Sequence, residues 1–477
     1  MRKAPNNDPN NPCAHSYKPT ERWFGCSAAV RFMIKNMTQG SPAKILLSFT
    51  LPMLLSVVFQ QLYSIVDSVV AGRYIGMNAL AAVGLSTPIT IIFLAFATGS
   101  STGCSVVVSQ LFGAKEISEM KTAISTAIIS IVTLSTVITG IGLLICNPLI
   151  RLINTPAEIF DDSALYLRIY VYGLLFLFLY NAATAILTGL GDSRTPLYFL
   201  IFSSVLNIIL DLVFVIVLKM GVAGVGWATF IAQGLASVLA IIYLLIRMKR
   251  IKADQPHKIF DLSMLFRMYR IAIPSILQQS FVSVGQLCVQ NLINGFGSAV
   301  IAGFSAAFKI NTFTVTSIST IANALSSYTA QNIGARKPER VKVGYRAAVW
   351  MVAVFYVIIS VILFGFGKQI LSLFMDDSAT REVLTVGLHF TWVVTPFYIM
   401  VALKVVTDSV MRGAGAMKQF MITTFFDLVL RVILAYLLSG WLGYSAVYWA
   451  IGIGWTLSML LALWFYHRGT WLSKEII

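Results

Sequence analysis

Two aspartates in apolar segments are the residues of this sequence best suited to chemistry. Asp67 and Asp211 have no basic residue three or four positions away that could neutralise them on a helix face. A carboxylate in such a segment is costly unless a cavity, an ion or a second charge solvates it. Asn207 stands one helical turn before Asp211 and would bring an amide to the same face. Together these side chains could load and release a proton, or hold a sodium ion through their oxygens.

A glycine-rich stretch, ILTGLGDSRTP at residues 186–196, raises a different chemistry. Its Gly-Leu-Gly-Asp matches the Gly-x-Gly-Asp of intramembrane aspartyl proteases, which need a second aspartate close enough to share a proton. Asp192 falls at a predicted helix junction, whereas Asp67 and Asp211 lie toward the opposite ends of their helices. We therefore expect a glycine turn in which Asp192 caps the next helix, and no enzyme activity. The protease remains a distant alternative.

Four more charged residues in apolar segments form two pairs. Lys404 with Asp408, and Asp427 with Arg431, are spaced four residues apart. At this spacing two side chains meet on one helix face, so each pair can neutralise itself. We expect structural ion pairs or polar cavity walls at these positions. No separate metal site is predicted, beyond a sodium ion at Asp67 and its companions.

The composition requires a membrane to surround these residues. The chain has 477 residues, of which 57% are hydrophobic and only 11% charged, too few charges to cover a soluble globule. A helix needs about 20 apolar residues to cross a bilayer. Twelve such segments are found, near residues 45–71, 79–111, 122–146, 163–188, 195–218, 222–247, 268–293, 299–329, 346–366, 384–411, 419–438 and 442–466. The sequence predicts an all-α polytopic membrane protein.

The net charge of +16 would suggest a nucleic-acid partner in a soluble protein, but its distribution favours another explanation. Lys and Arg gather in alternate loops, as the positive-inside rule predicts, so we expect both termini in the cytoplasm, a plasma-membrane location and no nucleic-acid partner. The predicted units are a cytoplasmic tail at 1–41, a first lobe at 42–247, a cytoplasmic loop at 248–267, a second lobe at 268–467 and a C-terminal tail at 468–477.

The two predicted lobes are copies of one another. SQLFGAKE at 109–116 recurs as AQNIGARKPE at 330–339, and GVAGVGWA at 221–228 recurs as GYSAVYWA at 443–450. An even number of spans in each copy makes the repeats parallel, an arrangement that suits alternating access to a cavity between them. The copies of Asp67 and Asp211 fall near Cys288 and residues 432–435, without a carboxylate. This asymmetry favours a functional role for the two aspartates.

Four stretches, in order, resemble the multidrug and toxic compound extrusion (MATE) family: LPMLLSVVFQQLYSIVDSVVAGRYIG, SQLFGAKE, ILTGLGDSRTP and LNIILDLVFVI. The resemblance covers residues 42–467. It implies a fold of two six-helix lobes and a secondary active antiporter. Such a protein exports small organic cations or other amphiphilic drugs in exchange for H⁺ or Na⁺, with no other cofactor. We expect membrane lipid around it and a monomeric state.

The resemblance is closer to the DinF-type branch of the family than to the NorM-type branch. It implies an ion-coupling site in the first lobe at Asp67, Asn207, Asp211 and Thr229, with a further polar position at Asn181 or Thr184. The NorM-type branch has an acidic residue in its seventh helix, but the corresponding stretch after Pro274 reads Gln-Ser-Phe-Val at 279–282.

A lipid-linked sugar flippase of the same superfamily is the alternative transporter. Such flippases tend to line their cavity with Arg for a pyrophosphate, and Arg431, Lys309 and Lys404 allow this hypothesis. The aspartates of the first lobe, where such flippases would need cations, argue against it.

Overall fold

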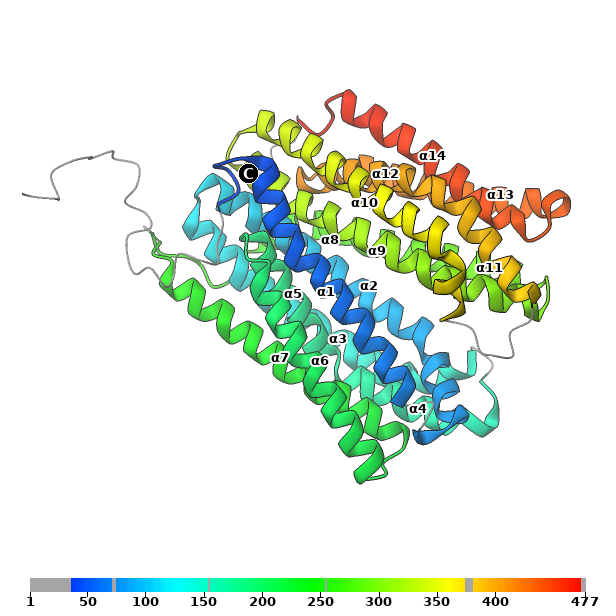
Figure 1. Ribbon diagram of the computed structural model, residues 1–477. Helices are drawn as coiled ribbons and strands as arrows, with labels where there is room; N and C mark the ends of the chain where they lie inside the picture. The colour runs from blue at the N-terminus through cyan, green and yellow to red at the C-terminus, as the bar shows by residue number, and fades with distance from the viewer. Residues whose placement is uncertain (1–35, 71–73, 153–154, 254, 374–380, 473–477) are drawn as a thin grey trace, which may run out of the picture.

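A computed structural model describes residues 36–70, 74–152, 155–253, 255–373 and 381–472. Their regular secondary structure is helical throughout (Figure 1). The first half contains α1 (Pro42–Val70), α2 (Met77–Ala114), α3 (Ile117–Leu152), α4 (Ala157–Tyr172), α5 (Leu174–Gly189), α6 (Arg194–Leu212), the π-helix η2 (Val213–Val217) and α7 (Val222–Arg250). The second half contains α8 (Leu262–Asn294), α9 (Ser298–Gly334), α10 (Pro338–Ser372), α11 (Arg381–Val394), the 3-10 helix η3 (Thr395–Phe397), α12 (Tyr398–Gly413), α13 (Met417–Leu442) and α14 (Ser445–His467).

The predicted spans are confirmed. Eleven helical segments in the described part of the chain are long and apolar enough to cross a membrane, and α4 with α5, bent by 46°, makes a twelfth. Several helices run beyond the apolar stretch that predicted them: α10 covers 338–372, where hydrophobicity indicated 346–366. Hydrophobicity marks the edge of the bilayer, whereas a helix continues until its backbone is capped. The protein is a multi-pass membrane protein.

The helices form two bundles, α1–α7 and α8–α14, which lie side by side in Figure 1. Their contact is made chiefly by α2, which packs along α8 and α9, and by α1, which packs along α9 and α10. The backbone repeats as well as the sequence. Gly221 and Gly443, 222 positions apart, have φ/ψ of 60°/−140° and 57°/−140°. These angles are open only to glycine, so both copies kept the residue that the turn requires.

The two bundles touch backbone to backbone where α2 and α9 end. A Cβ on Gly113 would overlap the carbonyl oxygen of Gln331, and a Cβ on Gly334 would overlap that of Gln110. Gly113 and Gly334 are repeat partners, 221 positions apart, so the contact is symmetrical. Only glycine permits this approach. It closes the space between the bundles at the end that carries the predicted cytoplasmic loops.

The segment before each bundle rests on the other bundle. The first lead-in segment, residues 36–41, precedes α1 and lies on α9 and α10. The backbone N–H of Met37 donates to Gln331 Oε1 at 3.0 Å, Lys337 Nζ donates to the Thr38 carbonyl at 3.2 Å, and Arg340 Nη2 donates to that of Gly40 at 2.9 Å. Met37 is fully buried.

The second lead-in segment, residues 255–261, precedes α8 and lies on α3 of the first bundle. The backbone N–H groups of Lys258 and Asp261 donate to Thr122 Oγ1 at 3.1 Å and Thr126 Oγ1 at 3.0 Å. Asp261 also caps α8 by accepting from the N–H of Met264 at 3.0 Å. The hydrogen bond from Lys258, followed by this cap, lowers the pKa of Asp261 to about 2. The segment is therefore anchored at both ends.

Candidate functional site

Three of the predicted coupling residues meet between α6 and α7. Asp211 is fully buried, and Asn207 lies one turn before it. With the Asn207 amide oriented by its partners, Nδ2 donates to Asp211 Oδ2 at 3.1 Å, while Oδ1 accepts from the Thr229 N–H at 3.2 Å and hydroxyl at 3.3 Å. A carboxylate, an amide and a hydroxyl thus form one buried network in the first bundle.

The chain leaves this network in an unusual conformation. The π-helix η2 begins two residues after Asp211, with the N–H of Leu218 donating to the Val213 carbonyl at 2.9 Å. Single π-turns occur frequently at functional sites. Val215 of this turn packs with Val70 of α1 and Val225 of α7. The side chain of Asp67 lies outside the described residues, although its helix, α1, packs against α6.

The two alternative positions on α5 have partners within their own helix. Asn181 Nδ2 donates to the Leu177 carbonyl at 2.8 Å, and Thr184 Oγ1 donates to that of Tyr180 at 2.8 Å. Thr229 instead borders a small cavity of ≈ 10 Å³, lined also by Tyr166, Ile169, Tyr170, Gly173, Gly226, Phe230 and Gln233. Such a volume holds about one water molecule. A space of this size therefore adjoins the network at Thr229.

Asp192 caps a helix, as predicted. Its Oδ1 accepts from the backbone N–H groups of Arg194 at 3.2 Å and Thr195 at 3.0 Å, at the start of α6. Its Oδ2 accepts from the hydroxyls of Thr195 at 2.7 Å and Tyr243 at 3.4 Å. Both carboxylate oxygens are thus engaged in structural hydrogen bonds. The glycine-rich stretch is a turn between α5 and α6, not a protease motif.

The large cavity lies in the second bundle. It measures ≈ 530 Å³, within the usual range for sites that bind drug-sized molecules. Its walls come from α8, α9, α12, α13 and α14, with α2 closing the side toward the first bundle. The neutral polar lining consists of Thr98, Thr102, Ser275, Gln278, Gln279, Gln286, Gln290, Asn311, Thr312, Thr316, Ser319, Asn323, Ser409 and Thr424.

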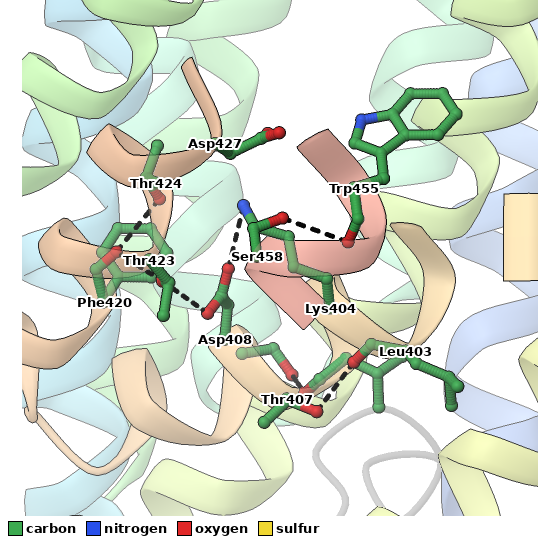
Figure 2. Close-up of polar contacts among 12 residues, drawn as sticks. Leu403, Lys404, Thr407, Asp408, Phe420, Thr423, Thr424, Asp427, Trp455 and Ser458 are labelled. Atoms are coloured by element: carbon green, nitrogen blue, oxygen red, sulfur yellow. Dashed lines mark hydrogen bonds and ion pairs between the residues drawn. The ribbon is translucent and has the colours of Figure 1, made fainter. Parts of the chain in front are cut away.

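Both predicted ion pairs form, and both lie on this cavity wall. Lys404 Nζ is 3.1 Å from Asp408 Oδ2, and Thr423 donates its hydroxyl proton to Asp408 Oδ1 at 2.8 Å. Figure 2 shows Lys404 and Asp408 on one helix, with Thr423 reaching them from α13. Arg431 donates to Asp427 Oδ2 at 2.8 Å. The spacing of four residues predicted these contacts correctly.

One charged residue of the wall lies beyond the span that the sequence predicts. Arg412 directly follows the apolar segment 384–411 and was not among the candidate site residues. In the structure it is the penultimate residue of α12, on the same face as Lys404 and Asp408. Its guanidinium donates to Asn323 and lies 5.9 Å from the centre of the Phe420 ring. The repeated spacing of four from Lys404 through Asp408 was the signal that could have identified it.

Proteins of known name match almost the whole chain. The probable multidrug resistance protein YpnP of Bacillus subtilis is 29% identical over 92% of this chain and 98% of its own length. The probable multidrug resistance protein YoeA of the same species is 28% identical over 90% and 94%. The multidrug export protein MepA of Staphylococcus aureus is 21% identical over 88% and 92%.

Solved structures share the fold. A MOP superfamily transporter from Pyrococcus furiosus, described as having a binding pocket of reverse polarity, superposes with a TM-score of 0.86 at 24% identity, over 92% of this chain and 98% of the other. An outward-facing MATE family transporter superposes with a TM-score of 0.85 at 24% identity, over 93% and 99%. The MatE family model matches twice, at residues 52–213 and 274–437, once in each bundle. The chain belongs to the MatE family, the MATE transporters, and has their fold of two six-span lobes.

Proposed function

We propose that this protein is a secondary active exporter of amphiphilic compounds, driven by an inward flow of H⁺ or Na⁺. The named relatives, multidrug resistance and multidrug export proteins, support the direction and the kind of cargo. We place it in the plasma membrane with both termini in the cytoplasm, because the basic residues gather in the loops of one side. It would act as a monomer.

One observation carries the proposal: the buried carboxylate network and the large cavity are in different lobes. Asp211, with Asn207 and Thr229, offers a group whose charge can change, and Asp67 would join it from α1. The cavity of the second lobe offers the space for cargo. Separate sites allow the ion and the cargo to bias the same lobe movement without competing for the same atoms.

The second lobe has an ion pair where the first lobe has the carboxylate network, and this difference supports separate sites for ion and cargo. At the repeat position of α6, helix α13 carries Asp427 and Arg431, which pair with each other at 2.8 Å. The carboxylate of the second lobe is thus engaged by a guanidinium, whereas that of the first lobe accepts from an amide. The arrangement favours ion coupling in the first lobe, as in the DinF-type branch of the family. The stretch 279–282 of α8, in the region where the NorM-type branch has an acidic residue, contains none and agrees with this.

The charges of the cavity favour an exporter over the flippase. Of the described residues in its wall, three are basic and two are acidic, and both acids are paired with bases. A pyrophosphate would require a strongly positive lining of unpaired cations. The nearly balanced wall suits a cargo of low net charge.

Transport by the purified chain in proteoliposomes tests the proposal. A proton gradient and a sodium gradient, imposed separately, identify the ion if one of them drives ethidium against its own gradient. Expression in an efflux-deficient bacterium should also lower ethidium accumulation. If a broad panel of amphiphiles shows unchanged accumulation despite confirmed membrane expression, the drug-exporter function is wrong and the flippase becomes the better hypothesis.

A further inference from the structure

The cavity of the second lobe has a surplus of positive charge at one place. Five of its described lining residues are charged: Lys404, Asp408, Arg412, Asp427 and Arg431. With ordinary ionisation the wall carries one more positive than negative charge. Lys404, Asp408 and Arg412 follow one another at intervals of four along α12, so two cations flank a single carboxylate. Asp408 forms its ion pair with Lys404, and Arg412 is the cation left over.

The acidic groups of the wall present no exposed, unpaired oxygen to a ligand. Asp408 uses one oxygen for Lys404 and the other for Thr423. Asp427 uses Oδ2 for Arg431, while its Oδ1, which has no hydrogen-bond partner among the described residues, is buried against α14. There a Cβ on Gly454 would come within 3.1 Å of that oxygen. A cationic ligand in this cavity would therefore meet no open carboxylate.

Arg412 does have donors to spare. Its Nη2 donates to Asn323 Oδ1 and its Nε to Ser326 Oγ at 3.4 Å, both neutral partners. A guanidinium carries five N–H groups in a planar fork, so the Nη1 side is available within the described surroundings. Phe420 supports the guanidinium from its face. This environment fixes the orientation of the cation without neutralising it.

The remaining wall is apolar and aromatic where it is not neutral amide or hydroxyl. Val282, Val289, Phe304, Phe308, Val315, Val401, Val405, Phe420, Ile451 and Trp455 provide this surface. A cavity of ≈ 530 Å³ with such walls takes an amphiphile of drug size.

We infer that the cavity recognises amphiphiles that carry an acidic group, with Arg412 binding that group. The inference rests on the proposed function, since it names the cargo of the same exporter. Arg412 lies at the end of α12 where the lobes are closed together, so the acidic group would lie at that end of the cavity and the apolar part would fill the space between α8, α9 and α14. A zwitterion meets this requirement as well as a simple anion does.

Binding of a matched pair of dyes tests this. Rhodamine B has a free carboxylate beside its cationic ring system, and its ethyl ester has the cation alone. The full chain in nanodiscs is titrated with each dye by fluorescence anisotropy, with empty nanodiscs subtracted to remove membrane partitioning. The wild type should bind the acid about tenfold more tightly than the ester. Arg412→Gln should remove that preference while leaving the affinity for the ester nearly unchanged, and Arg412→Lys should retain part of it.

Lys342→Gln provides the matched control, because Lys342 is an exposed cation that pairs with Glu339 outside the cavity wall. Both affinities should stay at the wild-type value in this variant. A wild type that prefers the ester, or an Arg412→Gln variant that weakens both dyes equally, would overturn the inference. If Arg412→Gln fails to fold, the wild-type preference and the Arg412→Lys variant still decide it. Gradient-driven export of ethidium without a preference for the acid would leave the proposed function intact and refute only this inference.

Discussion

Gln331 of α9 donates its side-chain amide to the Gly189 carbonyl at 2.8 Å, across the boundary between the lobes. Its repeat partner, Gln110 of α2, donates to the Gly413 carbonyl at 3.0 Å. Each glutamine therefore binds the glycine turn of the opposite lobe, and both side chains are almost fully buried. These two bonds, with the packing of Gly113 and Gly334, hold the predicted cytoplasmic ends of the lobes together.

Replacing both glutamines should weaken this closure. In the variant Gln110→Leu/Gln331→Leu, the closed arrangement would bury the Gly413 carbonyl and the Met37 N–H without these hydrogen-bond partners, at a cost of about 1 to 3 kcal/mol each. The Gly189 carbonyl would keep the Ser109 hydroxyl. The population should therefore shift toward open lobes, and spin labels on the two predicted cytoplasmic ends should report longer distances. Gln369→Leu changes the same residue type at an exposed position of α10 and should leave the distances unchanged. Identical distance distributions in the double variant and the wild type would contradict this role.

A side chain on either contact glycine should have a stronger effect. Gly113→Ala places a methyl group on the backbone carbonyl of Gln331, and backbone cannot move aside as a flexible side chain can. The closed arrangement should therefore be excluded, and ion-driven export should be lost while the protein still reaches the membrane. Gly140→Ala is the matched control, because a Cβ at Gly140 of α3 meets no atom within 4 Å. Normal export by Gly113→Ala would show that closure at this point is dispensable.

Neutralising the buried carboxylate should uncouple transport. Asp211→Asn keeps the size of the side chain but removes the group that we propose binds H⁺ or Na⁺, so gradient-driven export should fall by about tenfold or more. Asp67→Asn is expected to have the same effect. Protein abundance should change little, and Asp162→Asn, at an exposed position of α4, should export normally. If both variants retain full driven transport, the coupling site lies elsewhere, and Asp408 becomes the next candidate.

The pair of Asp427 and Arg431 should behave as a structural pair. Removing one partner leaves a buried charge without compensation, which typically costs about 3 to 5 kcal/mol. Arg431→Met should accordingly lower the melting temperature, measured as the loss of the size-exclusion peak of the folded protein on heating. The exchange Asp427→Arg/Arg431→Asp should recover much of this loss, because it restores the ion pair. A swapped protein no more stable than the single variant would contradict this role, because a restored ion pair would then not restore stability.

The elements that the sequence predicted well are those that depend on neighbouring residues. Apolar segments of bilayer length identify spans, and a spacing of four identifies the pair of Lys404 and Asp408, because both properties are local to one helix. The approach of Asn207 to Thr229, from the next helix, came from the family resemblance rather than from spacing. Arg412 was missed because hydropathy places the end of a span before the end of its helix.

The contacts between lobes could not be predicted in this way. Gln331 and Gly189 are 142 positions apart, and nothing in their local sequence indicates that they meet. The same holds for Met37 on Gln331 and for Lys258 on Thr122. Such contacts depend on how two finished bundles fit together. The internal repeat identifies which residues are equivalent, but not which ones face each other.

Because the lead-in segments cross over, the first helix of each lobe is mechanically connected to both lobes. The segment before α1 is hydrogen-bonded to the second lobe, while α1 itself packs both on α6 of its own lobe and on α9 and α10 of the other. The segment before α8 is hydrogen-bonded to the first lobe, and α8 packs both on α13 and on α2. A rigid rotation that separates the lobes must therefore either detach these segments or flex both helices. Pro52 in α1 and Pro274 in α8, 222 positions apart, interrupt the backbone ladder near those starts, where bending is easiest. Bending would strain α1 and α8 when the lobes separate. Release of that strain would favour the return to the closed arrangement in each transport cycle.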